Sequence, residues 1–170
     1  MLIESGKRLQ RRQVHDLAEL MAIYECNYIR LRQLIPDLQR IDERTLSRVD
    51  QALDLHLRVL ERSPYTTTLV LTYLFEDEQG SFPAPDIRIR IYHDARLAEV
   101  LSCGRRRGRR EAEYDRNRRA CSLDDKWRMN RFLQKWLGYC LRQGHRFQVP
   151  GKALCGVPSW DALMAEFGRD

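Results

Sequence analysis

The adjacent pair His93-Asp94 is the first feature of this 170-residue sequence that could do chemistry. A histidine oriented by a carboxylate can serve as a general base, but the two side chains must meet around a third group. Side chains of adjacent residues usually diverge, and "IYHDARLAEV" has the pattern of a strand, a four-residue turn and a second strand. We therefore expect a turn in which Asp94 bonds nearby backbone N–H groups, and we assign no catalytic residue.

The second feature is an arginine-rich segment, "GRRRGRREAEYDRNRRAC", at residues 104–121. It holds eight arginines and three acidic residues, out of 26 arginines and four lysines in the chain. Guanidinium groups bind phosphate backbones, and an aromatic ring among them can stack on a base. The alternative is a solvated run of charge without a ligand. The residues we expect to bind phosphate or nucleic acid are Arg105, Arg106, Arg107, Arg109, Arg110 and Tyr114.

The composition and the absence of known motifs exclude several classes of function. The chain is 43% hydrophobic and 32% charged with a net charge of +6, which is typical of a folded basic domain. It contains no P-loop, no dinucleotide fingerprint and no metalloprotease motif, and its five cysteines form no CxxC pair. We therefore expect no metal and no cofactor. Its longest apolar run, "LVLTYLF", is too short to span a membrane, so we expect a cytoplasmic protein without a membrane partner.

Alternation of apolar and polar residues predicts four antiparallel strands that position these features. The first two strands, within residues 53–75, are expected to fold about Ser63–Tyr65, which pairs Leu57 with Leu71. Residues 76–86 are expected to form a loop, and strands at 87–92 and 97–102 to form a second hairpin. That hairpin sets Arg90 opposite Glu99 on its outer face, where we expect an ion pair.

Two long segments with helical periodicity flank these strands, at residues 14–35 and 122–143. We expect Asn27 to be solvated on the first helix and Phe132 to lie on the buried face of the second. A short C-terminal helix is expected from Ser159 onward. The predicted fold class is α+β, a four-stranded antiparallel meander with both long helices on one face. The expected organisation is a basic arm at 1–13, one domain at 14–146 and an extension at 147–170.

Three stretches resemble the YqiB-like family of uncharacterised bacterial proteins. They are "LMAIYECNYIRLRQLIPD", "YTTTLV" with "IRIRIYHDARLAEV", and "KWRMNRFLQKWLGYCLRQG", and together they span about residues 16–146. The resemblance implies a cytoplasmic protein without an assigned activity. The family-motif positions, to which it gives no role, are Tyr92, His93, Asp94, Glu99 and Asp115.

Three functions follow from these features. The first is a non-catalytic module that binds RNA or another phosphate-rich ligand through the arginine-rich segment and the basic outer side of the second helix. The second is a small enzyme that acts on a nucleotide or phosphate ester at the His93 turn. The third is an adaptor that binds a protein through its C-terminal helix, with Trp160 and Phe167 as contacts, and through the outer face of the sheet.

Overall fold

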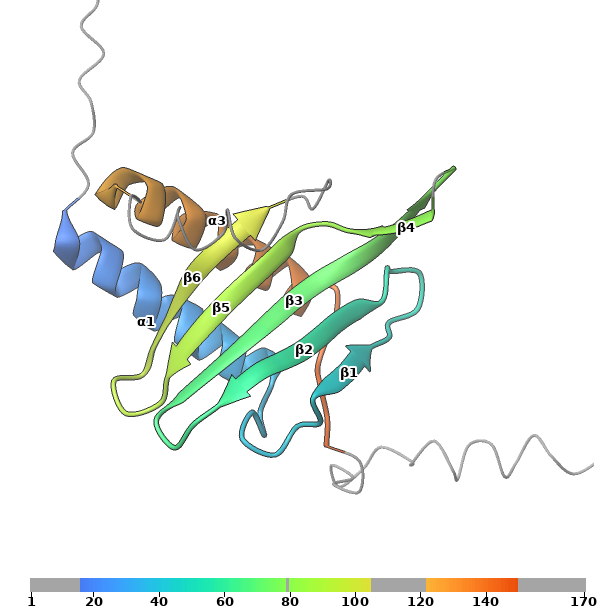
Figure 1. Cartoon of the computed structure of the whole chain (residues 1–170), viewed down its shortest axis with the longest axis horizontal. Coiled ribbons are helices and arrows are strands. Elements are labelled where there is room, and N and C mark those ends of the chain that lie inside the picture. The colour runs from blue at the N-terminus through green and yellow to red at the C-terminus, as the bar shows by residue number, and fades with distance from the viewer. Residues whose placement is uncertain (1–15, 79, 105–121, 150–170) are drawn as a thin grey trace, which may run out of the picture.

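The fold consists of a six-stranded antiparallel sheet with two helices packed against one face (Figure 1). A computed structural model describes residues 16–78, 80–104 and 122–149. The strands run in the order β1-β2-β3-β5-β6, and β4 pairs with β3 beside this path. The elements are α1 (Leu17–Leu34), β1 (Arg44–Ser47), β2 (Leu55–Arg62), β3 (Thr66–Asp77), β4 (Gly80–Pro83), β5 (Asp86–Tyr92), β6 (Leu97–Gly104) and α3 (Leu123–Arg142).

Local capping residues set where the two helices begin. Asp16 caps α1 by accepting a hydrogen bond from the Glu19 N–H at 2.7 Å. At α3, Ser122 and Asp125 form a capping box, in which each side chain accepts from the backbone N–H of the other residue. These contacts satisfy N–H groups that the first helical turn leaves without partners.

The predicted strand registers are confirmed. Leu57 pairs with Leu71 across β2 and β3, and Ile91 pairs with Ala98 across β5 and β6. These residues alternate onto one face of the sheet, which the helices cover (Figure 1). The fully buried centre of this core consists of residues from both layers, among them Leu31, Leu34, Leu55, Leu69, Leu71, Ile87, Ile89, Ile91, Leu133 and Leu137.

The predicted four-stranded sheet is wrong in its strand count, because β1 and β4 add two strands. β1 is a four-residue polar edge strand, too short to show an alternating pattern. β4 lies in the segment expected to be a loop, and Pro83 is compatible with pairing there because β4 pairs only with β3. Gly80 begins β4 with φ 117°, a conformation that glycine adopts readily. The predicted C-terminal helix lies outside the described residues.

Two helix side chains differ from the prediction in how far they are buried. Asn27 is completely buried, whereas Phe132 is 44% exposed. Asn27 is three residues after Tyr24 and four before Leu31, which places it on the buried face of α1. Phe132 directly precedes the buried Leu133 and is not among the buried residues of α3.

Two leucines of β3 provide a test of how far the core extends. Leu71 is fully buried, whereas Leu74, which pairs with Pro83 of β4, is 40% exposed. We expect Leu71→Ala to lower the free energy of unfolding by about 2–5 kcal/mol, because it leaves a cavity. The matched Leu74→Ala should cost less than about 1 kcal/mol. Urea denaturation measures both, and equal losses would contradict this placement of the core.

Candidate functional site

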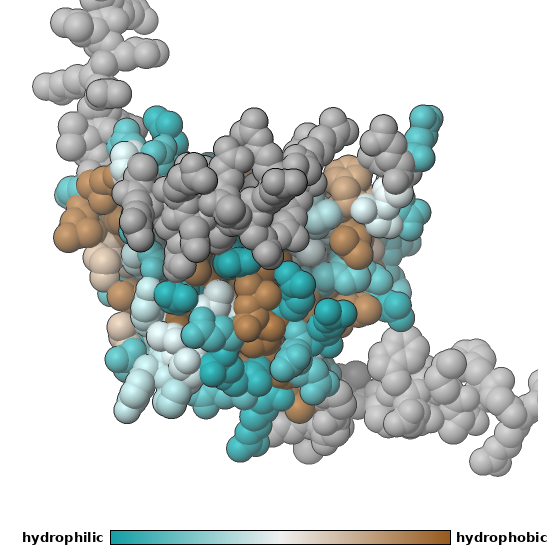
Figure 2. All heavy atoms as spheres, viewed as in Figure 1, coloured by the Kyte–Doolittle hydropathy of each residue, from teal (hydrophilic) through white to brown (hydrophobic). Residues whose placement is uncertain are grey.

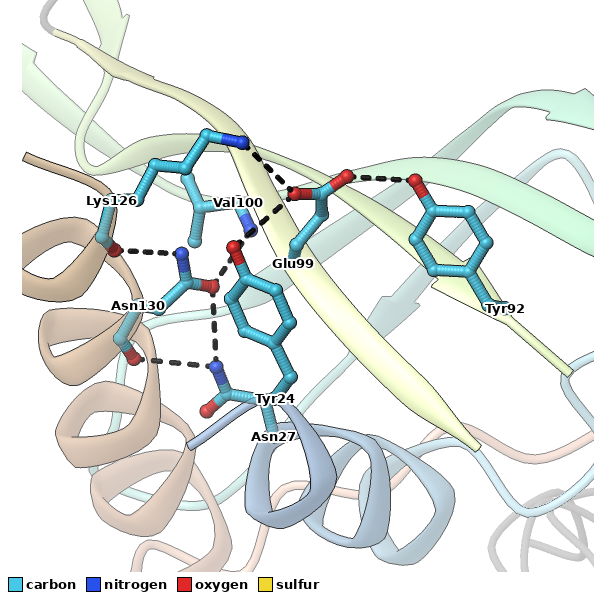
Figure 3. A network of polar contacts seen from close by, with 7 residues as sticks. All are labelled: Tyr24, Asn27, Tyr92, Glu99, Val100, Lys126 and Asn130. Atoms are coloured by element: carbon cyan, nitrogen blue, oxygen red, sulfur yellow. Dashed lines mark hydrogen bonds and ion pairs between the residues drawn. The ribbon is translucent and has the colours of Figure 1, made fainter. Parts of the chain in front are cut away.

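Glu99 lies on the edge strand β6, where both helices reach the sheet (Figure 3). Its Oε1 accepts a hydrogen bond from the Tyr92 hydroxyl at 2.7 Å. Its Oε2 accepts from the Tyr24 hydroxyl at 3.4 Å and lies 4.0 Å from Lys126 Nζ. The side chain of Glu99 is only 17% exposed. One carboxylate therefore contacts α1, β5 and α3.

The predicted ion pair between Arg90 and Glu99 is wrong, although the two residues do face each other in the register. Arg90 instead forms an ion pair with Glu61 at 3.6 Å and donates to Thr68 Oγ1 at 3.2 Å. Glu99 is contacted by the hydroxyls of Tyr24 and Tyr92 and by Lys126. The difference arises because the sequence pattern gave strand neighbours but not the reach of side chains from the helices.

The two tyrosines that contact Glu99 act as hydrogen-bond donors. Burial, followed by the effect of the Glu99 carboxylate, raises the pKa of Tyr24 and also that of Tyr92. Both hydroxyls therefore keep their protons at neutral pH. Because these donors and Lys126 already surround the carboxylate, the arrangement is suited to holding the helices on the sheet rather than to accepting a proton from a substrate.

Two buried asparagines continue this network from Glu99 into the helix pair (Figure 3). Asn130 Oδ1 accepts from the backbone N–H of Val100 at 2.9 Å, and its Nδ2 donates to the Lys126 carbonyl at 2.8 Å. Asn27 Nδ2 donates to the Asn130 carbonyl at 3.3 Å. An edge strand presents N–H groups without strand partners, and Asn130 supplies an acceptor for one of them.

The histidine and aspartate of the β5–β6 turn do not form a dyad. His93 Nε2 shares a hydrogen bond with Thr67 Oγ1 at 2.8 Å, and the His93 N–H donates to the Tyr65 carbonyl at 2.8 Å. Asp94 is exposed at the surface. Burial, and then the charge of Arg32, lowers the pKa of His93, while Asp94 partly opposes this. His93 therefore joins the turns of two hairpins.

The sheet face opposite the helices, which we term the outer face, carries arginines in line across the strands. Arg44 of β1 lies directly opposite Arg58 of β2. Arg58 neighbours Val70 of β3, and Val70 neighbours Arg88 of β5. We term Arg44, Arg58 and Arg88 the arginine row. Figure 2 shows that hydrophilic residues predominate on the described part of this face.

Other features of the described chain lie apart from these residues. A hollow of about 250 Å³ at the end of the sheet is lined by aromatic rings that include Phe75, Trp136 and Tyr139. Among residues 16–78, 80–104 and 122–149, no group of three or more His, Cys, Asp or Glu side chains could hold a metal ion. No helix in the part of the chain that the structure describes is long and apolar enough to cross a membrane.

The structure brings together Tyr92 and Glu99 and places His93 and Asp94 at the adjoining turn. The other predicted site residues lie outside the described residues: Arg105, Arg106, Arg107, Arg109, Arg110, Tyr114 and Asp115. Sequence reasoning missed Asn130, although its position three residues before the buried Leu133 was an available signal. It also missed Arg44, because β1 was not predicted.

The asparagine contacts predict that Asn130→Ala lowers the stability of the protein and also the hydrogen-exchange protection of one amide, that of Val100. The change leaves the buried Val100 N–H without its acceptor and should cost about 1–3 kcal/mol of unfolding free energy. Hydrogen exchange should show a larger loss of protection at the Val100 amide than at other β6 amides. An unchanged exchange rate at Val100 would contradict the role given to Asn130.

Two histidines predict how stability depends on pH. Burial lowers the pKa of His145, whose Nδ1 lies 3.1 Å from Ser47 Oγ, and also lowers that of His93. Each therefore binds protons more weakly in the folded than in the unfolded protein. Stability should be full above the unfolded pKa of about 6.5 and should fall as the pH drops below it. Between pH 7.5 and 5.0, the melting temperature should depend less on pH in the double variant His93→Gln/His145→Gln than in the wild type. The same pH dependence in both proteins would contradict the role given to these histidines.

Comparison with known proteins agrees with the resemblance seen in the sequence. Residues 30–146 match the model of a family described as "Protein of unknown function (DUF1249)". The chain is 34% identical over 135 residues to the uncharacterised protein YqiB of Escherichia coli K12, covering 79% of this chain and 94% of YqiB. YqiB of E. coli O6:H1 strain CFT073 gives the same values. No solved structure matches the chain significantly. The chain therefore belongs to the DUF1249 family of YqiB-like proteins.

Proposed function

We propose that this protein is a non-catalytic module that binds RNA or another phosphate-rich ligand. The ligand would contact the arginine-rich segment at 104–121 and the outer face of the sheet. The observation that carries this proposal is the arginine row, which places guanidinium groups from β1, β2 and β5 on one side of the sheet. The helices lie on the opposite side (Figure 1), so the basic outer side of the second helix, α3, is no longer part of the proposed binding surface.

Chain connectivity links the two arginine-bearing regions. The arginine-rich segment follows directly from β6, which is an edge strand of the same sheet, and leads to Ser122 at the start of α3. The segment is therefore attached where the sheet layer and the helix layer meet. Arginines on strands and arginines in an adjoining segment can together neutralise several phosphates of one backbone.

The geometry of the motif residues supports a non-catalytic role. The His93 ring is engaged by Thr67, and the neighbouring Asp94 carboxylate is exposed rather than directed at that ring by a hydrogen bond. Glu99 is surrounded by two hydroxyl donors and an ammonium group. A general base needs an accessible position beside its substrate proton, which these contacts do not provide.

The proposal predicts that the arginine-rich segment contributes strongly to affinity. Replacement of Arg105, Arg106, Arg107, Arg109 and Arg110 by Ser should remove most nucleic-acid affinity. If all five contact phosphates, they should contribute about −4.5 on duplex or about −3.5 on single strands to the slope of log affinity against log salt, and the segment variant should lose that contribution. Fluorescence anisotropy on mixed RNA and DNA oligonucleotides measures both quantities, and melting curves should show nearly unchanged stability.

A control with the same loss of charge separates local contacts from net charge. It replaces five exposed arginines of the helices and the α1–β1 connection with Ser: Arg32, Arg40, Arg128, Arg131 and Arg142. We expect this control to bind nearly as tightly as the wild type, because distant charges are screened at about 0.1 M salt. Absence of wild-type binding near 100 mM salt would end the nucleic-acid proposal, and equal binding by the segment variant would remove the arginine-rich segment from it.

A further inference from the structure

We propose that the arginine row is a binding site for the phosphodiester backbone of RNA, with the pair Arg44 and Arg58 as its anchor. This inference rests on the proposed function. It adds where on the sheet the RNA binds and that its phosphate groups are the part recognised. It concerns strand residues that are separate from the arginine-rich segment, so the two regions can be tested independently.

The register fixes the spacing of the guanidinium-bearing positions. Arg44 and Arg58 are direct partners in an antiparallel pair, so their Cα atoms lie roughly 5 Å apart. Arg88 lies two strands beyond Arg58, past Val70, which is a separation of roughly 10 Å. The row therefore presents three long cationic side chains across roughly 15 Å of the sheet. This extent suits contact with more than one phosphate.

The charge at the anchor lacks compensation within the described chain. Arg44 and Arg58 are exposed, and the side chain of neither has a hydrogen bond or ion pair among the residues that the structure describes. Neighbouring arginines differ, since Arg48 pairs with Asp54 at 3.1 Å and Arg90 with Glu61 at 3.6 Å. Like charges directly opposite each other destabilise a strand pair. A phosphate bound between Arg44 and Arg58 would remove that repulsion.

The residues in line with the row indicate which part of the ligand is recognised. The row continues through Val70 and ends at Ser102 of β6, so no aromatic ring stands in it. Tyr92, which also faces outward, donates its hydroxyl to Glu99. Base stacking needs an aromatic platform, whereas guanidinium forks bind phosphate oxygens in pairs. The site is therefore suited to a phosphate backbone and to binding without sequence preference.

The first test is the double variant Arg44→Gln/Arg58→Gln, with Arg128→Gln/Arg131→Gln on the exposed side of α3 as the charge-matched control. On a mixed-sequence 20-nucleotide RNA, the double variant should bind about tenfold or more weakly at 100 mM salt. Its log-log salt slope should be smaller in magnitude by about 1.4, since two single-strand phosphate contacts are lost. The control should retain wild-type affinity, and RNAs of different sequence should bind wild type equally.

The second test uses Arg58→Glu, which sets a carboxylate opposite Arg44. This change should raise the melting temperature at low salt, because it replaces repulsion by attraction across the strands. The same variant should lose RNA affinity, as the double variant does. Misfolding cannot produce this combination of higher stability and weaker binding.

The possible results distinguish a failure of the arginine-row site from a failure of the proposed RNA-binding function. RNA binding that survives in Arg44→Gln/Arg58→Gln, or that is lost in the α3 control instead, would overturn the site while leaving the proposed function standing. A melting temperature lowered by Arg58→Glu would show that the two arginines do not repel each other. Absence of any wild-type binding would overturn both proposals.

Discussion

The hydrogen bond from the Val100 N–H to Asn130 fixes the point at which the helix layer attaches to the edge of the sheet, above the shared hydrophobic core. It attaches α3 to the free edge of β6, and Asn27 attaches α1 to the same point through the Asn130 carbonyl. Glu99, the residue beside Val100, adds Tyr24 and Lys126 to this connection. Burial makes these polar contacts strongly directional, because an amide without a partner is costly in the core. The helices are therefore held over one face and one edge.

This attachment determines which surface is left for a ligand. With α1 and α3 held over the core face, the outer face is free of helices in the described chain (Figure 1). The strand register places the arginine row on this face. The β5–β6 turn is occupied by its own contacts, since His93 bonds Thr67. Of the family-motif residues, Tyr92, His93 and Glu99 thus contact the scaffold, whereas Arg44 and Arg58, whose side chains have no partner in the described chain, lie on strands of the outer face.

The sequence predicted the strands in which apolar and polar residues alternate regularly. It did not predict the short strand β1 or the single contact between two buried asparagines. Alternating leucines and isoleucines gave the registers of β2 with β3 and of β5 with β6, because a one-residue slip would turn the apolar side chains out of the core. The short polar β1 has no such pattern, so the pairing of Arg44 with Arg58 could not be inferred. Asn27 and Asn130 were not predicted as partners, because composition and periodicity do not show which buried polar groups meet across 103 positions of sequence.

The most direct measurement of the central claim is an NMR titration that follows the arginine Nε–Hε resonances while mixed-sequence RNA is added. If the outer face binds the phosphate backbone, the resonances of Arg44, Arg58 and Arg88 should shift together and saturate at one RNA concentration. Those of Arg128 and Arg131 on α3 should change little. Shifts at the α3 arginines, with the arginine row unmoved, would contradict the account.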